Sequence, residues 1–233
     1  MRLDMHSDTR LRCLRAAVIL ATLAALTLLG SSCQGDEDTS TIVLGGSGVE
    51  INGQAWDYRG SAMSREIEMP DAVLTSTHGA DFDVRSETEG FVTLLYVGYT
   101  HCPDLCPTHM AAVARALNGL PADAAAGVKV LFVTSDPERD SPSVLDAWLA
   151  QFDPSFIGLT GSSEDLVAFQ RDLGMNPATT EAGGHEHQDY SVNHAGYVLA
   201  FPPDSRTALI AYPPGAASED YLADLATLTA GGP

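Results

Sequence analysis

Apolar and polar positions along residues 70–233 alternate in blocks that predict both strands and helices. Two apolar runs, residues 91–99 and 128–134, are nearly continuous, as is typical of strands covered on both faces of a sheet. A stretch with turn residues or helical spacing of apolar positions follows each run. Near the C-terminus, two further strand-like runs flank a Pro-Pro-Asp turn and lead into a last helical segment. The pattern predicts strands that alternate with helices.

This order of elements predicts an α/β domain with a thioredoxin-like fold, in which helices flank a central mixed sheet. Ser141 and Pro142 supply a capping residue and an early proline for one helix. Residues 175–191 have turn residues and little periodicity, so we expect an exposed loop there. The predicted elements are a hairpin at 73–84 turning at 79–81, strands at 91–99, 128–134, 196–201 and 208–212, and helices at 108–117, 141 to about 152, 162 or 163 to 174, and 218–228.

The N-terminal residues 1–32 have the pattern of a signal peptide. Four arginines precede an apolar stretch of 14 residues, Ala16 to Leu29, which is shorter than the ~20 residues of a membrane span. Small residues then lead to Cys33, and this arrangement resembles the lipobox of bacterial lipoproteins, whose cysteine is lipidated. We expect Cys33 to carry the lipid and to anchor the protein at the outer face of the bacterial cytoplasmic membrane. Plain secretion and an uncleaved anchor are the alternatives.

Composition divides the rest of the chain into a tether and one domain. Residues 33–48 are rich in Gly, Ser, Thr and Asp, which predicts a flexible tether, and residues 49–233 are long enough for a single domain with a core. The formal net charge of the chain is −19. Such a charge disfavours nucleic acid and anionic lipid as partners, and solubility is its simplest explanation.

A pair of cysteines carries the candidate chemistry. Cys102 and Cys106 are the only cysteines after Cys33 and follow the first buried strand, where a helix is expected to begin. The positive end of a helix favours thiolate over thiol, and thiolates bind soft metals and attack disulfides. A disulfide that merely staples the helix start would close a loop too short to stabilise the fold much. The pair therefore predicts thiol redox chemistry, soft-metal binding, or both.

Three blocks of sequence resemble the Sco/SenC family of copper-binding assembly factors of cytochrome c oxidase. These are residues 98–107 (GYTHCPDLCP), residues 133–142 (VTSDPERDSP) with 156–161 (FIGLTG) downstream, and residues 189–194 (DYSVNH), where Asn193 replaces a usual Asp. The resemblance covers about residue 70 to the C-terminus. It implies that Cys102, Cys106 and His194 bind one copper ion, as Cu(I) or Cu(II). It also places Asp136 near the metal.

The resemblance implies a membrane-tethered copper chaperone that loads the dinuclear copper centre of cytochrome c oxidase subunit II. Other copper carriers or thiol reductants are further expected partners. The alternative is a thiol–disulfide oxidoreductase that uses Cys102 and Cys106 as a redox pair on the oxidase subunit or on other exported proteins. A copper or redox sensor is a third reading, which no signalling element supports. His194 distinguishes the copper chaperone from the oxidoreductase, because copper binding is expected to use it and thiol exchange does not require it.

The remaining histidines and methionines have simpler explanations. His101 adjoins Cys102, but adjacent side chains point apart, so we expect it to face solvent or to shape local electrostatics. His78 and His109 are predicted to be surface residues. His185 and His187 lie in the predicted loop, where they offer at most an auxiliary copper contact. Met110 lies at helical spacing and is predicted to be part of the core, although a thioether from Met110 or Met175 could bind a soft metal.

Overall fold

The computed structural model describes residues 42–45, 48–51, 54–182, 190–193 and 196–232. Thr41–Pro233 form one compact unit. The predicted signal peptide and Cys33 lie outside the described residues. In the part of the chain that is described, no helix combines the length and apolar character needed to cross a membrane.

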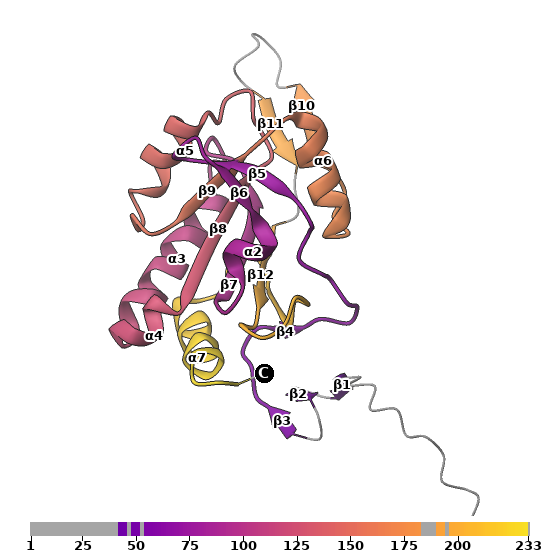
Figure 1. Cartoon of the computed structure of the whole chain (residues 1–233), viewed down its shortest axis with the longest axis vertical. Helices are drawn as coiled ribbons and strands as arrows, with labels where there is room; N and C mark the ends of the chain where they lie inside the picture. The colour runs from indigo at the N-terminus through magenta and orange to yellow at the C-terminus, as the bar shows by residue number, and fades with distance from the viewer. Residues whose placement is uncertain (1–41, 46–47, 52–53, 183–189, 194–195, 233) are drawn as a thin grey trace, which may run out of the picture. The chain divides into compact units, whose positions relative to one another are not determined.

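Eight strands form one mixed sheet at the centre of this unit (Figure 1). The three strands β7, β8 and β9 run parallel, and all other neighbours in the sheet are antiparallel. Every residue of β7 is buried, as expected for a strand covered on both faces. The order is β4 (Ser61–Ala62), β13 (Ile210–Tyr212), β12 (Val198–Phe201), β7 (Val92–Gly98), β8 (Val128–Thr134), β9 (Ile157–Thr160), β5 (Val73–Ser76) and β6 (Asp81–Asp83).

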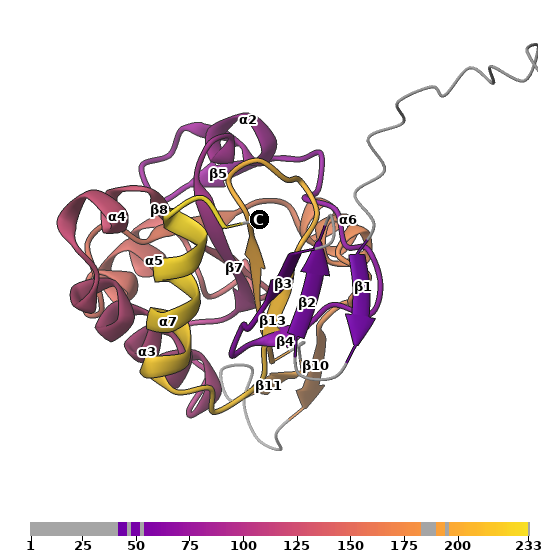
Figure 2. The same cartoon turned by 90° about the horizontal axis from the view of Figure 1, so that it is seen from below.

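Helices cover both faces of the sheet (Figure 2). Alternate residues of β7 point to opposite faces, so Leu94 and Tyr96 lie in one core cluster and Leu95 and Val97 in the other. The first cluster also contains residues of α3 (Leu105–Gly119), α5 (Pro142–Leu149) and α7 (Ser218–Thr229), and the second contains residues of α6 (Ser163–Asp172). The helices α2 (Val84–Thr88) and α4 (Ala122–Ala126) are short.

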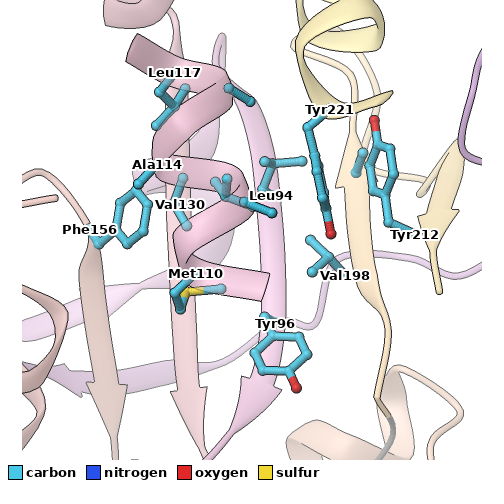
Figure 3. Packing of buried hydrophobic residues seen from close by; sticks show 14 of the residues in the cluster. Leu94, Tyr96, Met110, Ala114, Leu117, Val130, Phe156, Val198, Tyr212 and Tyr221 are labelled. Atoms are coloured by element: carbon cyan, nitrogen blue, oxygen red, sulfur yellow. The ribbon is translucent and has the colours of Figure 1, made fainter. Parts of the chain in front are cut away.

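On the first face, α3 packs beside α7. Tyr221 of α7 and Tyr212 of β13 lie against each other with ring centroids 4.1 Å apart (Figure 3). Met110 and Ala114 of α3 lie over the sheet near Tyr96 and Val130, which confirms Met110 as a core residue. This packing fixes α3, and with it the start of the helix, against β7.

Most of the predicted elements are present. The hairpin at 73–84 is β5 paired with β6, and the strands predicted at 91–99 and 128–134 are β7 and β8. Ser141 caps α5 by accepting from the N–H of Val144 at 3.4 Å. Ser162 caps α6 in the same way, because its hydroxyl accepts from the N–H of Asp165 at 3.1 Å. The helix predicted at 108–117 begins earlier, at Leu105, and therefore includes Cys106.

Two predicted irregular segments contain strands. Residues 175–191 were expected to form a loop, but β10 (Thr179–Ala182) pairs with β11 (Tyr190–Asn193), since short runs with β-branched and aromatic residues favour strands even without clear alternation. Part of the predicted tether is also strand. In the tether, β1 (Ile42–Gly45) is the first strand of a three-stranded antiparallel sheet, which continues past the predicted boundary at residue 48 with β2 (Gly48–Ile51) and β3 (Gln54–Trp56). The Ile-Val-Leu run in β1 outweighs the polar composition around it.

Candidate metal and dithiol site

Two of these sequence blocks, residues 98–107 with the cysteine loop and residues 133–142 with the DPERD block, meet at the carboxyl ends of two parallel strands. Gly98 ends β7 and Thr134 ends β8. Ser135 joins the segments that follow, because its N–H and its hydroxyl both donate to the Gly98 carbonyl, at 2.7 Å and 3.0 Å. In open α/β sheets this edge is where ligands bind. The geometry thus places two of the three blocks that carry the family resemblance at one candidate site.

The two cysteines lie together and are largely shielded from solvent. Cys106 is the second residue of α3 and is completely buried, and Cys102 is 9% exposed. The backbone N–H of Cys106 donates to Sγ of Cys102 at 3.4 Å. The Tyr96 hydroxyl donates to Sγ of Cys106 at 3.5 Å. Both residues are thiols rather than a disulfide in the structure.

Burial changes the expected acidity of the pair. The position of Cys106 in the first helical turn predicted a stabilised thiolate, but burial raises the pKa of the Cys106 thiol, and its contact with the Cys102 thiol raises it further. Hydrogen bonds from Tyr99 and Tyr96 lower the pKa only in part. The prediction was therefore wrong for Cys106, because the loss of solvation outweighs the field of the helix.

The close approach of Cys106 to the sheet depends on Gly98. A Cβ on Gly98 would lie 2.7 Å from Cε1 of Tyr96, 2.9 Å from Sγ of Cys106 and 3.2 Å from Cε2 of Phe132. Contacts below 3.0 Å are not tolerated without a shift of the neighbouring atoms. The absence of a side chain at Gly98 therefore makes room for the sulfur of Cys106.

A buried carboxylate connects the DPERD block to the cysteine loop. Asp140 is completely buried and accepts three hydrogen bonds. Its partners are the backbone N–H of Thr100 at 3.0 Å, the Thr100 hydroxyl at 2.5 Å and the Thr134 hydroxyl at 2.7 Å. Asp140 therefore fixes the residue two positions before Cys102. Local sequence does not reveal this role, although Asp140 belongs to the DPERD block.

Asp136 also helps to position the cysteine loop, through its ion pair with Arg139. Its carboxylate is buried and pairs with the guanidinium of Arg139, which lies over the ring of Tyr99 with 5.8 Å between Cζ and the ring centroid. Its backbone N–H donates to the Thr134 hydroxyl at 2.9 Å. Asp136 thus opens the turn, as its sequence position predicted, and braces the start of the cysteine loop through Arg139. A place near a bound metal remains a prediction.

The described histidines differ in their exposure to solvent. His101 is exposed, as expected, and so is His78. His109 was predicted to lie at the surface, but it is 1% exposed. Its Nδ1 lies 2.9 Å from the Tyr221 hydroxyl, and its Nε2 lies 3.2 Å from the Gly196 carbonyl. The prediction was wrong because α7 covers the face of α3 that carries His109, which local sequence does not reveal.

Several predicted site residues lie outside the described residues. These are His194, His185, His187 and Cys33. By sequence, His194 falls between β11, which ends at Asn193, and β12, which begins at Val198. Met175 is described and is buried in the core cluster on the α6 face of the sheet.

The fold and the buried cysteine pair together define a thioredoxin-like protein with a dithiol at the carboxyl end of a central strand. The SCO1/SenC family model matches residues 63–230, and the chain belongs to this family.

Individual relatives agree with this assignment. Over 144 residues the chain is 34% identical to a protein of Stutzerimonas stutzeri that bears the name "Putative copper-binding protein", covering 61% of this chain and 68% of that one. The solution structure of apo Sco1 from Thermus thermophilus is 31% identical, with a TM-score of 0.65, and the match covers 73% of this chain and 96% of that chain. ScoI of Bradyrhizobium japonicum, solved with copper bound, is 28% identical, with a TM-score of 0.60, covering 67% and 96%.

The curated mitochondrial relatives are matched over a smaller share of their length. The chain is 34% identical to the SCO1 homolog 1 of Arabidopsis thaliana over 112 residues, which are 48% of this chain but 33% of that protein.

Proposed function

We propose that this protein is a copper chaperone that holds its cargo between Cys102, Cys106 and His194 and passes it to the dinuclear copper centre of cytochrome c oxidase subunit II. Membership of the SCO1/SenC family supports this proposal, and so do the name of the relative from Stutzerimonas stutzeri and the copper-bound structure from Bradyrhizobium japonicum. We further propose that a lipid on Cys33 tethers it outside the cytoplasm.

The burial of the dithiol is the observation that carries the proposal. A nucleophilic cysteine that attacks protein disulfides has to be accessible and largely ionised. Cys106 is completely buried, and its pKa is raised by that burial. A soft metal ion overcomes both obstacles, because it is small and displaces the thiol proton when it binds. The site therefore suits metal binding better than rapid disulfide exchange.

The donor set also fits copper by its chemistry. Thiolates are soft ligands that select Cu(I), and an imidazole nitrogen suits Cu(II) as well. The contact between the two thiols means that one ion can reach both sulfurs with little movement. Two thiolates and one imidazole can thus hold copper in both oxidation states.

A thiol–disulfide oxidoreductase is the second candidate function. The same contact between Cys102 and Cys106 would allow the two residues to close into a disulfide after a small rearrangement. Under this alternative the copper ligand at His194 is dispensable, since thiol exchange depends on thiolate character and access.

Copper titration of the reduced protein tests the proposal. We expect one copper ion per chain, with a thiolate-to-Cu(II) charge-transfer band in the oxidised form. Replacing Cys102 or Cys106 with serine should abolish the band and weaken Cu(I) binding by more than about 100-fold, because even residues that merely orient a ligand contribute 10–100-fold. His194→Ala should lose Cu(II) first and keep part of the two-thiolate Cu(I) binding.

Oxidase assembly in cells separates the two functions. Cells that carry only the His194→Ala variant should have low oxidase activity, which added copper partly restores. Normal assembly with His194→Ala, together with failed assembly for Cys102→Ser, would refute the chaperone proposal in favour of thiol exchange. Tight copper binding by a variant that lacks both cysteines would place the copper site elsewhere, with His185 and His187 tested first.

A further inference from the structure

Solvent exposure decreases across three residues of the cysteine loop, from His101 through Cys102 to Cys106. The side chain of His101 is 52% exposed, that of the neighbouring Cys102 is largely buried, and Cys106 is completely buried. The residue next to Cys102 therefore offers an ion from another protein a solvent-exposed side chain, whereas both cysteines are buried. Whether His101 can bind an ion depends on which of its ring nitrogens has a free lone pair.

The hydrogen bonds around His101 determine its tautomer. The Thr100 hydroxyl has a single proton, which it donates to the carboxylate of Asp140 at 2.5 Å. Its contact with Nδ1 of His101, at 3.0 Å, therefore requires the imidazole to donate. A neutral imidazole that carries its proton on Nδ1 has its lone pair on Nε2. The half-exposed ring thus presents a nitrogen donor.

The same arrangement is typical of histidines that bind metals. Such a histidine usually donates its other N–H to a carboxylate, a carbonyl or a water, which fixes the ring and makes the coordinating nitrogen more basic. Here the buried carboxylate of Asp140 acts through the Thr100 hydroxyl, and Nδ1 of His101 also lies 3.8 Å from Oδ1 of Asp140. Asp140 also accepts from the hydroxyl of Thr134 at the end of β8, so these hydrogen bonds fix His101 relative to the sheet.

His101 is nevertheless not arranged as a resident ligand beside the two cysteines. Among the described residues, which include all three side chains, no group of three or more His, Cys, Asp or Glu residues is placed to hold a metal ion. A donor that is exposed and braced, but outside the resident set, suits a transient contact with the ion.

We propose that His101 is an entry and exit ligand, whose Nε2 binds copper briefly while the ion moves between a partner and the buried cysteines. This inference rests on the proposed copper-chaperone function and adds the route by which the cargo enters. In loading, Nε2 forms a bond to Cu(I) while one bond to the donor breaks. The Cys102 and Cys106 thiols then lose their protons to water and bind the ion through their sulfurs, while the remaining bonds to the donor and then the bond to Nε2 break. Copper stays Cu(I), so no electron is transferred.

Transfer kinetics with the reduced full chain and the Cu(I)–bicinchoninate complex test this route. A group that binds copper only during transfer changes both rates without changing the equilibrium. His101→Gln should therefore slow loading and unloading by about tenfold or more. Its Cu(I) affinity should stay within about threefold of the wild type. His101→Met, whose thioether binds Cu(I) but cannot accept a proton, should recover most of the rate. The matched control is His78→Ala, an exposed histidine elsewhere, which should leave both rates unchanged.

Each other outcome overturns the inference in a distinct way. Wild-type rates in His101→Gln would show that copper enters without this residue. Equal slowing in the Gln and Met variants would assign His101 to proton transfer from the cysteines instead. Loss of Cu(I) affinity in His101→Gln would make it a resident ligand. If the wild-type chain binds no copper at all, the proposed function itself fails, which this equilibrium measurement detects separately from the rates.

Discussion

Replacing Gly98 with alanine adds one methyl group between the end of β7 and the start of α3. The new Cβ would lie 2.7 Å from a ring carbon of Tyr96 and 2.9 Å from the sulfur of Cys106. Both side chains are completely buried, so neither can move into solvent without disturbing the core. We expect the variant to fold with Cys106 displaced from its pocket.

The expected loss of stability follows from overpacking. An extra methyl group in a well-packed core costs about 1–3 kcal/mol. In a domain of roughly 150–250 residues, each kcal/mol lowers the melting temperature by about 2–4 °C. Gly98→Ala should therefore melt about 2–12 °C below the wild type. Calorimetry or circular dichroism on the metal-free, reduced protein measures this difference.

Gly158 provides a matched control away from the cysteines. It lies in β9, and a Cβ there would approach Cγ2 of Thr77 to 2.6 Å, Cδ1 of Leu149 to 2.9 Å and Cβ of Leu145 to 3.2 Å. Gly158→Ala should thus lose a similar amount of stability. Only Gly98→Ala should also make the Cys106 thiol react faster with a small alkylating reagent, measured in a Cys102→Ser background.

Two results would refute this reasoning. A melting temperature for Gly98→Ala equal to that of the wild type would mean that the sulfur of Cys106 does not lie against Gly98. Equal changes of Cys106 reactivity in the Gly98 and Gly158 variants would mean that the effect is general loosening of the core rather than displacement of one sulfur.

Two further predictions concern pH and membrane attachment. Burial raises the pKa of the Asp224 carboxyl, which is 1% exposed and accepts from Tyr212. The folded state therefore binds this proton more tightly than the unfolded state, and the stabilisation is lost as pH rises from the ordinary value of about 3.9 through the raised pKa. Urea unfolding should show this slope in the wild type and a smaller slope in Asp224→Asn, and equal slopes would contradict the assignment. Mass spectrometry of the mature N-terminus should find acyl groups on Cys33 and none in Cys33→Ala, whereas an unmodified Cys33 in the wild type would exclude the lipid anchor.

Local sequence was sufficient for the elements whose signals are local. The continuous apolar runs predicted β7 and β8, because a strand covered on both faces has no polar side. Ser141 and Ser162 marked the starts of α5 and α6, because a capping hydroxyl acts on its own helix. The cysteine pair was also predicted from sequence, since its residue types and its place after a buried strand already indicate thiol chemistry.

Tertiary structure decided what depends on contacts between distant segments. His109 is buried only because α7, more than a hundred residues later, packs against α3. The acidity of Cys106 reverses because the core removes water from a thiol that the helix alone would help to ionise. Asp140 reaches Thr100 across 40 positions because β7 and β8 are parallel neighbours whose carboxyl ends meet. Sequence thus determined which chemical groups the chain carries, and the packing of the sheet and helices determined their solvation and their partners.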